Sequence, residues 1–133
     1  EIIYYNQFHL LFFLDIQILF VKLMLGSQDV YLNVVGGLKI NEPSIDLGIM
    51  MATASSFKNI AIPKDMIIIG EVGLTGEIRR INLIEKRLKE AEKLGFKSCI
   101  IPESNKKDLK EKYKLDIIGV RNINEAMKKI GIK

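Results

Sequence analysis

Gln28-Asp-Val-Tyr-Leu-Asn-Val-Val-Gly-Gly-Leu-Lys-Ile-Asn-Glu-Pro-Ser44 and the later stretch Gly70-Glu-Val-Gly-Leu-Thr-Gly-Glu-Ile-Arg-Arg80 decide the fold of this chain. In the first stretch, the β-branched and aromatic run 30–35 predicts a strand, and Pro43 predicts the first turn of a helix, where a missing N–H costs nothing. In the second, glycines at 70, 73 and 76 predict a tight hairpin. Their spacing differs from that of a dinucleotide-binding loop, and a strand rather than a helix follows them.

The rest of the pattern alternates strands with helices. We expect helices over 47–57, 83–94, 104–112 and 122–130, and strands over 66–69, 77–81, 98–101 and 115–120. Asn82 with Glu85, and Asn122 with Glu125, have the spacing of a capping box, and Gly95 is placed as a C-cap. This order predicts a layered α/β domain.

The first 26 residues differ from this pattern. The run from Phe8 to Leu25 is strongly apolar, but Asp15 and Lys22 interrupt it. A charge at the membrane centre costs about 2.5–3.5 kcal/mol on insertion scales, so we expect no membrane span. The run also lacks the basic start and cleavage site of a signal peptide. We expect residues 1–26 to form a helix or an interface, residues 27–133 to form one domain, and the chain to be part of a longer protein.

Composition excludes several classes of site. The 133 residues are 48% hydrophobic, enough for the core of one globular domain. A single cysteine, Cys99, excludes an internal disulfide and a cysteine-based zinc site, and it fits a reducing cytoplasm. A single histidine cannot build a metal cluster by itself. No G-x-x-x-x-G-K-[ST] motif is present, so we expect no ATP site of that type.

The charge is distributed unevenly along the chain. Residues 1–78 carry four Lys and Arg against eight Asp and Glu, a net charge of −4, whereas residues 79–133 carry sixteen against eight, a net charge of +8. A basic half suggests a polyanionic partner, most simply nucleic acid. The candidate contacts are Arg79, Arg80, Lys86, Arg87 and Lys89. A solvated surface partly neutralised by Glu85, Glu90 and Glu92 is equally compatible with the sequence, and the run from Lys106 to Lys114 is interpreted as plain surface.

Ser44 raises the question of catalysis. A serine at a helix start is usually local capping chemistry. However, Glu42 and Asp46 cluster with it at a predicted helix start, where the helix dipole would stabilise an oxyanion. A serine nucleophile needs a base. Lys39, Lys86 and Lys89 are candidates, and the spacing favours none of them.

The two opening stretches, together with Arg87–Lys97 and Ile101-Pro102, resemble the C-terminal domain of the RadA (Sms) family of bacterial DNA repair proteins over residues 27–133. That domain is similar to the Lon protease domain, whose fold resembles domain 2 of ribosomal protein S5. The resemblance implies an α/β fold of the Lon peptidase-domain type. It also implies a ring-forming, ATP-driven motor that promotes branch migration, with ATP, Mg and zinc bound by parts outside this chain.

The same resemblance bears on catalysis. When Lon is aligned without gaps from the Pro-Ser pair, its serine falls on Ser44, its lysine on Arg87 and its assisting threonine on Ile69. An arginine cannot lose its proton at neutral pH. The resemblance therefore implies a cytoplasmic, non-proteolytic domain that supports a hexameric ring and contacts single-stranded or branched DNA, with a recombinase as a further partner. An active Ser-Lys peptidase with Ser44 as nucleophile is the alternative.

Overall fold

A three-stranded parallel sheet organises the part of the chain that the computed structural model describes, residues 43–132. Its strand order is β1 (Met66–Ile68), β4 (Ser98–Pro102) and β5 (Asp116–Val120), with Cys99 paired to Ile67 on one side and to Ile117 on the other. Parallel strands need long crossover connections. Those connections carry the helix α3 (Ile84–Lys93) and the short helix α4 (Glu103–Lys106).

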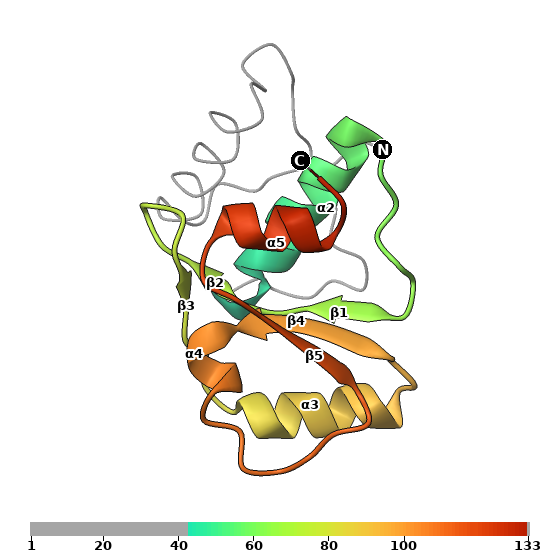
Figure 1. Cartoon of the computed structure of the whole chain (residues 1–133), viewed down its shortest axis with the longest axis vertical. Coiled ribbons are helices and arrows are strands. Elements are labelled where there is room, and N and C mark those ends of the chain that lie inside the picture. Colours follow the sequence, from blue (N-terminus) through green and yellow to red (C-terminus); the bar gives the residue numbers. More distant parts are fainter. Residues whose placement is uncertain (1–42, 133) are drawn as a thin grey trace.

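Helices cover both faces of this sheet (Figure 1). The helices α2 (Asp46–Lys58) and α5 (Ile123–Lys129) pack on one face, and α3 packs on the other. Successive side chains of a strand point to opposite faces, so β4 contributes Ile100 to the first core and Cys99 and Ile101 to the second. The sheet therefore separates two apolar cores, one beneath α2 and α5 and one above α3.

The glycine-rich stretch forms the predicted hairpin. Its strands β2 (Glu71–Val72) and β3 (Ile78–Arg79) pair antiparallel, and the Gly73 N–H donates to the Glu77 carbonyl over 2.8 Å. Gly76 adopts a φ of +85°, which favours glycine. Just before α2, Pro43–Ile45 form the 3-10 turn η1. Here η1 contacts β2, so the start of α2 lies against the hairpin.

Most of the predicted elements in the described range are confirmed, with bounds shifted by one or two residues. Gly95 follows α3 at a φ of +85°, and the Asn122 side chain accepts the Glu125 N–H over 2.9 Å at the start of α5. The predicted strand 30–35 and the segment 1–26 lie outside the described residues. Within the described part of the chain, no helix is long and apolar enough to cross a membrane.

Two local predictions are wrong. Asn82 does not cap α3: the N-cap is Leu83, in the left-handed region at a φ of 59°, with no side-chain hydrogen bond. The predicted helix 104–112 ends at Lys106, and a loop continues to β5. The loop makes local backbone hydrogen bonds as far as Leu109, and from there it takes partners on α3: the Lys110 N–H donates to the Glu85 side chain.

Candidate functional site

Ser44 lies in the turn η1, which contacts both the hairpin and the start of α2. Its carbonyl accepts the Gly70 N–H over 2.8 Å, and the Gly70 carbonyl in turn accepts the Leu47 N–H over 3.0 Å. Ser44 is only 5% exposed, and its hydroxyl makes no hydrogen bond to the described residues. Asp46, two residues further on, is also buried and accepts the Val72 N–H over 3.4 Å. The hydroxyl of Ser44 is therefore closed off from solvent.

The structure does not direct the side chains at the other two Lon positions toward Ser44. Arg87 lies on α3, on the opposite face of the sheet from α2, and its Nε donates to the Asn82 carbonyl over 3.3 Å. Ile69 is 8% exposed and packs in the core above α3. Lys86 and Lys89 are also on α3, so the sheet lies between these two lysines and the helix α2 that follows Ser44. The remaining candidate base, Lys39, lies outside the described residues.

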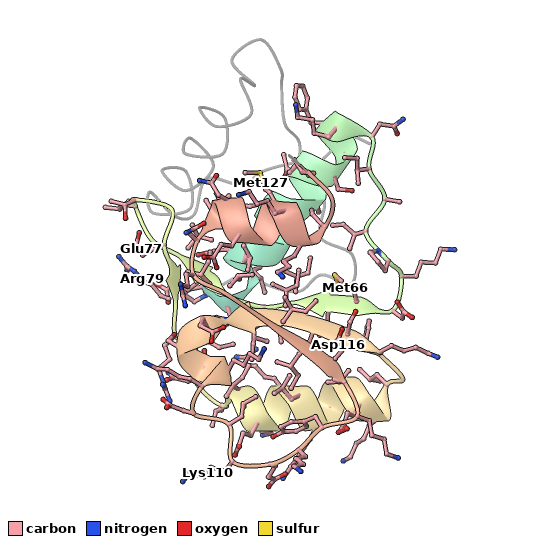
Figure 2. The ribbon with its side chains drawn as sticks, viewed as in Figure 1. Met66, Glu77, Arg79, Lys110, Asp116 and Met127 are labelled. Carbon is pink, nitrogen blue, oxygen red and sulfur yellow. The ribbon has the colours of Figure 1, made fainter. Side chains whose placement is uncertain are left out.

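The arginine pair at the end of the hairpin, Arg79 and Arg80, is exposed but forms ion pairs within the chain. Arg79 forms ion pairs with Glu71 at 3.8 Å and Glu77 at 3.2 Å, and Figure 2 shows Glu77 and Arg79 together on the hairpin. Arg80 pairs with Asp108 and donates to the Ser104 carbonyl over 2.9 Å. More than half of each arginine side chain is exposed to solvent. Surface pairs of this kind contribute about 0–1 kcal/mol, so an incoming phosphate can replace the carboxylates.

Glu77 fixes the geometry of the hairpin turn as well as one arginine. Its carboxylate accepts hydrogen bonds from the Thr75 hydroxyl and from the Thr75 N–H at 3.0 Å. These bonds, the hydroxyl first, lower the pKa of Glu77 to about 2. A Cβ on Gly73 would lie 1.9 Å from the Glu77 Oε1, so a larger residue there would displace this carboxylate. Glu77 thus links the turn to Arg79.

The helix α3 presents the rest of the predicted basic face. Leu88 and Ala91 are buried against the sheet, whereas Lys86, Lys89 and Lys93 are exposed. Lys89 pairs with Glu111 at 3.0 Å. Among the described residues, Lys86 and Lys93 have no ion-pair partner. The predicted shared face of the three lysines is thus confirmed as exposed, with one of the three neutralised locally.

Sequence reasoning missed the contribution of the loop after α4. The loop passes along α3 and carries four exposed lysines, and Figure 2 shows one of them, Lys110, beyond α3. The four are Lys107, Lys110, Lys112 and Lys114. The signal that could have found this arrangement is the spacing of Glu85, Lys89 and Glu92 on one side of α3, since these side chains contact the loop.

Chemistry of other kinds finds little support in the described part of the chain. Cys99 is fully buried, and this burial raises the pKa of its thiol to about 12, so it is not a nucleophile at neutral pH. No three His, Cys, Asp or Glu side chains between residues 43 and 132 gather as metal ligands do.

Comparison with known proteins places this chain in a family. The model of the Lon protease (S16) C-terminal proteolytic domain matches residues 21–132, and the chain belongs to this family. Its α/β fold of the Lon type is thereby confirmed.

Within the family, the chain is similar to proteins named DNA repair protein RadA. It is 49% identical to that of Bacillus subtilis over 108 residues, which are 81% of this chain and 24% of the relative. It is 46% identical to that of Listeria monocytogenes over 109 residues, 82% of this chain and 24% of the relative. With RadA of Haemophilus influenzae, it shares 50% identity over 84 residues, 63% of this chain and 18% of the relative. The resemblance to the Lon-like domain of RadA is confirmed, and the chain spans about a quarter of the length of its first relatives.

Proposed function

We propose that this domain has no peptidase activity and acts as a scaffold and DNA-contacting part of a RadA-type DNA repair protein. The observation that carries the proposal is a difference in exposure between Ser44 and the basic residues. The only residue that matches the Lon dyad, Ser44, is buried on the α2 face of the sheet, whereas exposed cations gather around the hairpin and α3.

The proposed lack of peptidase activity is supported by the chemistry of the positions that match the Lon serine and lysine. A serine hydroxyl is a weak nucleophile until a neighbouring base removes its proton. An arginine side chain does not act as a base at neutral pH, and Arg87 lies across the sheet from Ser44. At 5% exposure, Ser44 also offers little access to a peptide carbonyl.

The DNA contact rests on the exposed cations. Arginine and lysine side chains bind phosphate oxygens through charge-assisted hydrogen bonds and release condensed counterions from the DNA. Arg79, Arg80, Lys86, Arg87 and Lys89 are the proposed contacts, and Lys86 has no competing ion pair among the described residues. Such contacts read charge rather than base sequence, which suits a protein that acts on single-stranded or branched DNA.

The remaining expectations concern a longer protein and are part of the same proposal. In it, this domain would help to hold a hexameric ring, and segments outside this chain would bind ATP, Mg and zinc. A recombinase would be a further partner, and the cytoplasm the place of action. The names of the relatives support the part of this proposal that concerns DNA repair.

The test reverses the charge of the arginine pair. Arg79→Glu/Arg80→Glu in the intact protein should lower the affinity for labelled single-stranded DNA and reduce the slope of log K against log salt by about 2, one for each lost phosphate contact. The matched control is Lys128→Glu/Lys129→Glu in the last turn of α5, a helix that covers the face of the sheet opposite α3, and it should change affinity much less. Unchanged affinity in the arginine variant, with its fold verified by thermal unfolding, would remove the pair from the site.

The second candidate function is a Ser-Lys peptidase with Ser44 as the nucleophile. The observation in its favour is the place of Ser44 in the 3-10 turn that leads into the 13-residue helix α2, whose dipole would stabilise an oxyanion. This alternative predicts peptide hydrolysis that Ser44→Ala abolishes, and labelling by a serine-reactive probe. Absence of labelling in the folded protein counts against it.

A further inference from the structure

The loop between α4 and β5 is held along α3 at regular intervals. The Lys110 N–H donates to the Glu85 Oε1 over 3.0 Å, and the Lys114 N–H donates to the Glu92 Oε1 over 2.7 Å. Between these two points, Lys89 Nζ lies 3.0 Å from the Glu111 Oε1. On α3 the three residues are spaced i, i+4 and i+7, so they form one row along the helix.

Apolar side chains of the same loop anchor it from beneath. Leu109 and Tyr113 are half-buried against the core above α3, and Leu115 is buried in it. Lys110, Lys112 and Lys114 alternate with these anchors and are exposed. Burial, followed by the charges of Glu85, Glu111 and Glu92, raises the pKa of Tyr113, which agrees with the placement of these carboxylates around the loop. The alternation directs the lysines outward.

Glu85 and Glu92 carry negative charge on a face that is otherwise basic, yet they support the position of its lysines. In a simple charge count, Glu85 and Glu92 oppose the binding of a polyanion. In the structure, their carboxylates accept main-chain hydrogen bonds from the lysine-rich loop. Ordering a flexible loop on binding costs conformational entropy. A loop that is already ordered avoids this cost, so preorganisation increases affinity.

We propose that Glu85 and Glu92 are positioning residues for phosphate binding, which hold the loop so that Lys110, Lys112 and Lys114 extend the basic surface of Lys86 and Lys93. This inference rests on the proposed contact with DNA and adds to it a second set of contacts and the means of placing them. The ligand is the sugar-phosphate backbone of a nucleic acid strand, bound without reading its bases.

The experiment compares two double variants of equal charge in the intact protein. Glu85→Gln/Glu92→Gln keeps an oxygen acceptor at each position, whereas Glu85→Ala/Glu92→Ala removes both acceptors. Affinity for a labelled single-stranded oligonucleotide is measured at one salt concentration. The glutamine variant should bind at least as tightly as the wild type, and the alanine variant roughly three- to tenfold more weakly than the glutamine variant, through loss of preorganisation.

Two further measurements distinguish the effect of the glutamate hydrogen bonds on the loop from the effect of the lysine charges. Amide hydrogen exchange at Lys110 and Lys114 should be slow in the wild type and faster in the alanine variant, whether or not DNA is present. Lys110→Glu/Lys114→Glu leaves both main-chain donors in place and should lower DNA affinity more than the control pair Lys128→Glu/Lys129→Glu on α5.

The outcomes distinguish this inference from the proposed function. Equal DNA affinity of the glutamine and alanine variants, or unchanged exchange at Lys110 and Lys114 in the alanine variant, overturns the positioning role. If Arg79→Glu/Arg80→Glu still weakens binding, the proposed DNA contact survives that result. A wild-type protein that binds no DNA at low salt overturns both.

Discussion

The helices α2 and α3 pack on opposite faces of one sheet, and they differ in how many of their side chains are buried and how many are charged. In α2, Leu47, Met50, Met51 and Ala54 are fully buried, and Gly48 lies so close to β1 that a Cβ would be 3.2 Å from the Ile68 carbonyl. In α3, only Leu88 and Ala91 are buried, and charged side chains occupy most other positions.

The contrast shows where this domain can interact with other molecules. The α2 face keeps Ser44, the residue that matches the Lon nucleophile, but encloses it. The α3 face has no such residue, yet it carries exposed cations and a loop ordered by glutamates. A peptidase would depend on the first face and a DNA-binding scaffold on the second. The following predictions test how each face is built.

The largest effect is expected at Asn105, which ties the exit of the hairpin to α4 on the α3 side. This side chain is 1% exposed, accepts the Ile81 N–H over 2.9 Å and donates to the Ile81 carbonyl over 3.0 Å. Asn105→Ala should reduce the free energy of unfolding by about 2–4 kcal/mol, because two buried main-chain groups lose their partners. Denaturant unfolding measures this loss. Asn82→Ala, at an exposed position, is the control, and a similar loss in both variants would contradict the account.

A smaller effect is expected at Leu83, the N-cap residue of α3. Its left-handed φ of 59° costs a leucine about 1–2 kcal/mol, and 68% of the residue is exposed, so little packing compensates. Leu83→Asn should stabilise the protein by about 0.5 kcal/mol, because asparagine tolerates this conformation, whereas the β-branched variant Leu83→Val should destabilise it by about 1 kcal/mol. Equal unfolding free energies for the two variants would mean that Leu83 is not in this conformation.

The hairpin turn predicts a pH effect. Hydrogen bonds, first from the Thr75 hydroxyl, lower the pKa of Glu77 from 4.5 to about 2. Because the pKa is lower in the folded state, the stabilisation is fully present above pH 4.5 and is lost as the pH falls through about 2. Thr75→Val should raise the pKa of Glu77 toward its ordinary value while leaving the main-chain bond at Thr75. Titration of the carboxyl group by NMR measures the shift, and an unchanged pKa would contradict the assigned cause.

The smallest effect is expected at Cys99 on the α3 side of the sheet. With a pKa near 12 and no exposure, this thiol should not react with a disulfide reagent at pH 8 unless the protein unfolds. Reaction should appear only when denaturant is added. Rapid modification of the folded protein would show that the core above α3 is open.

Local chemistry explains which features could be predicted from the sequence. The hairpin glycines, the Gly95 cap and the Asn122 cap depend on dihedral angles or on partners three residues away, and all three are confirmed. Asn82 does not cap α3, because Leu83 occupies the N-cap position in a left-handed conformation. The approach to the helix is also set by a distant residue: Asn105, 24 positions further along the chain, hydrogen-bonds to the main chain of Ile81.

The candidate site was harder to predict for the same reason. Exposure of the basic residues followed from the amphipathic pattern of α3. The hydrogen bond between the Lys110 N–H and the Glu85 side chain joins residues that are 25 positions apart. The spacing of Glu85, Lys89 and Glu92 marks one row on α3, but it does not specify which segment that row contacts. The separation of Ser44 from Arg87 depends on which face of the sheet each helix covers, and that is set by the crossover connections rather than by residue spacing.

The most direct test of the central claim measures DNA affinity of the intact protein across a salt series, for the wild type, Ser44→Ala and Arg79→Glu/Arg80→Glu. If the basic surface formed by the hairpin and α3 contacts DNA, log K falls linearly with log salt, Ser44→Ala matches the wild type, and the arginine variant has a slope shallower by about 2. Binding that is absent at low salt, or that the arginine variant retains with an unchanged slope, would contradict the claim.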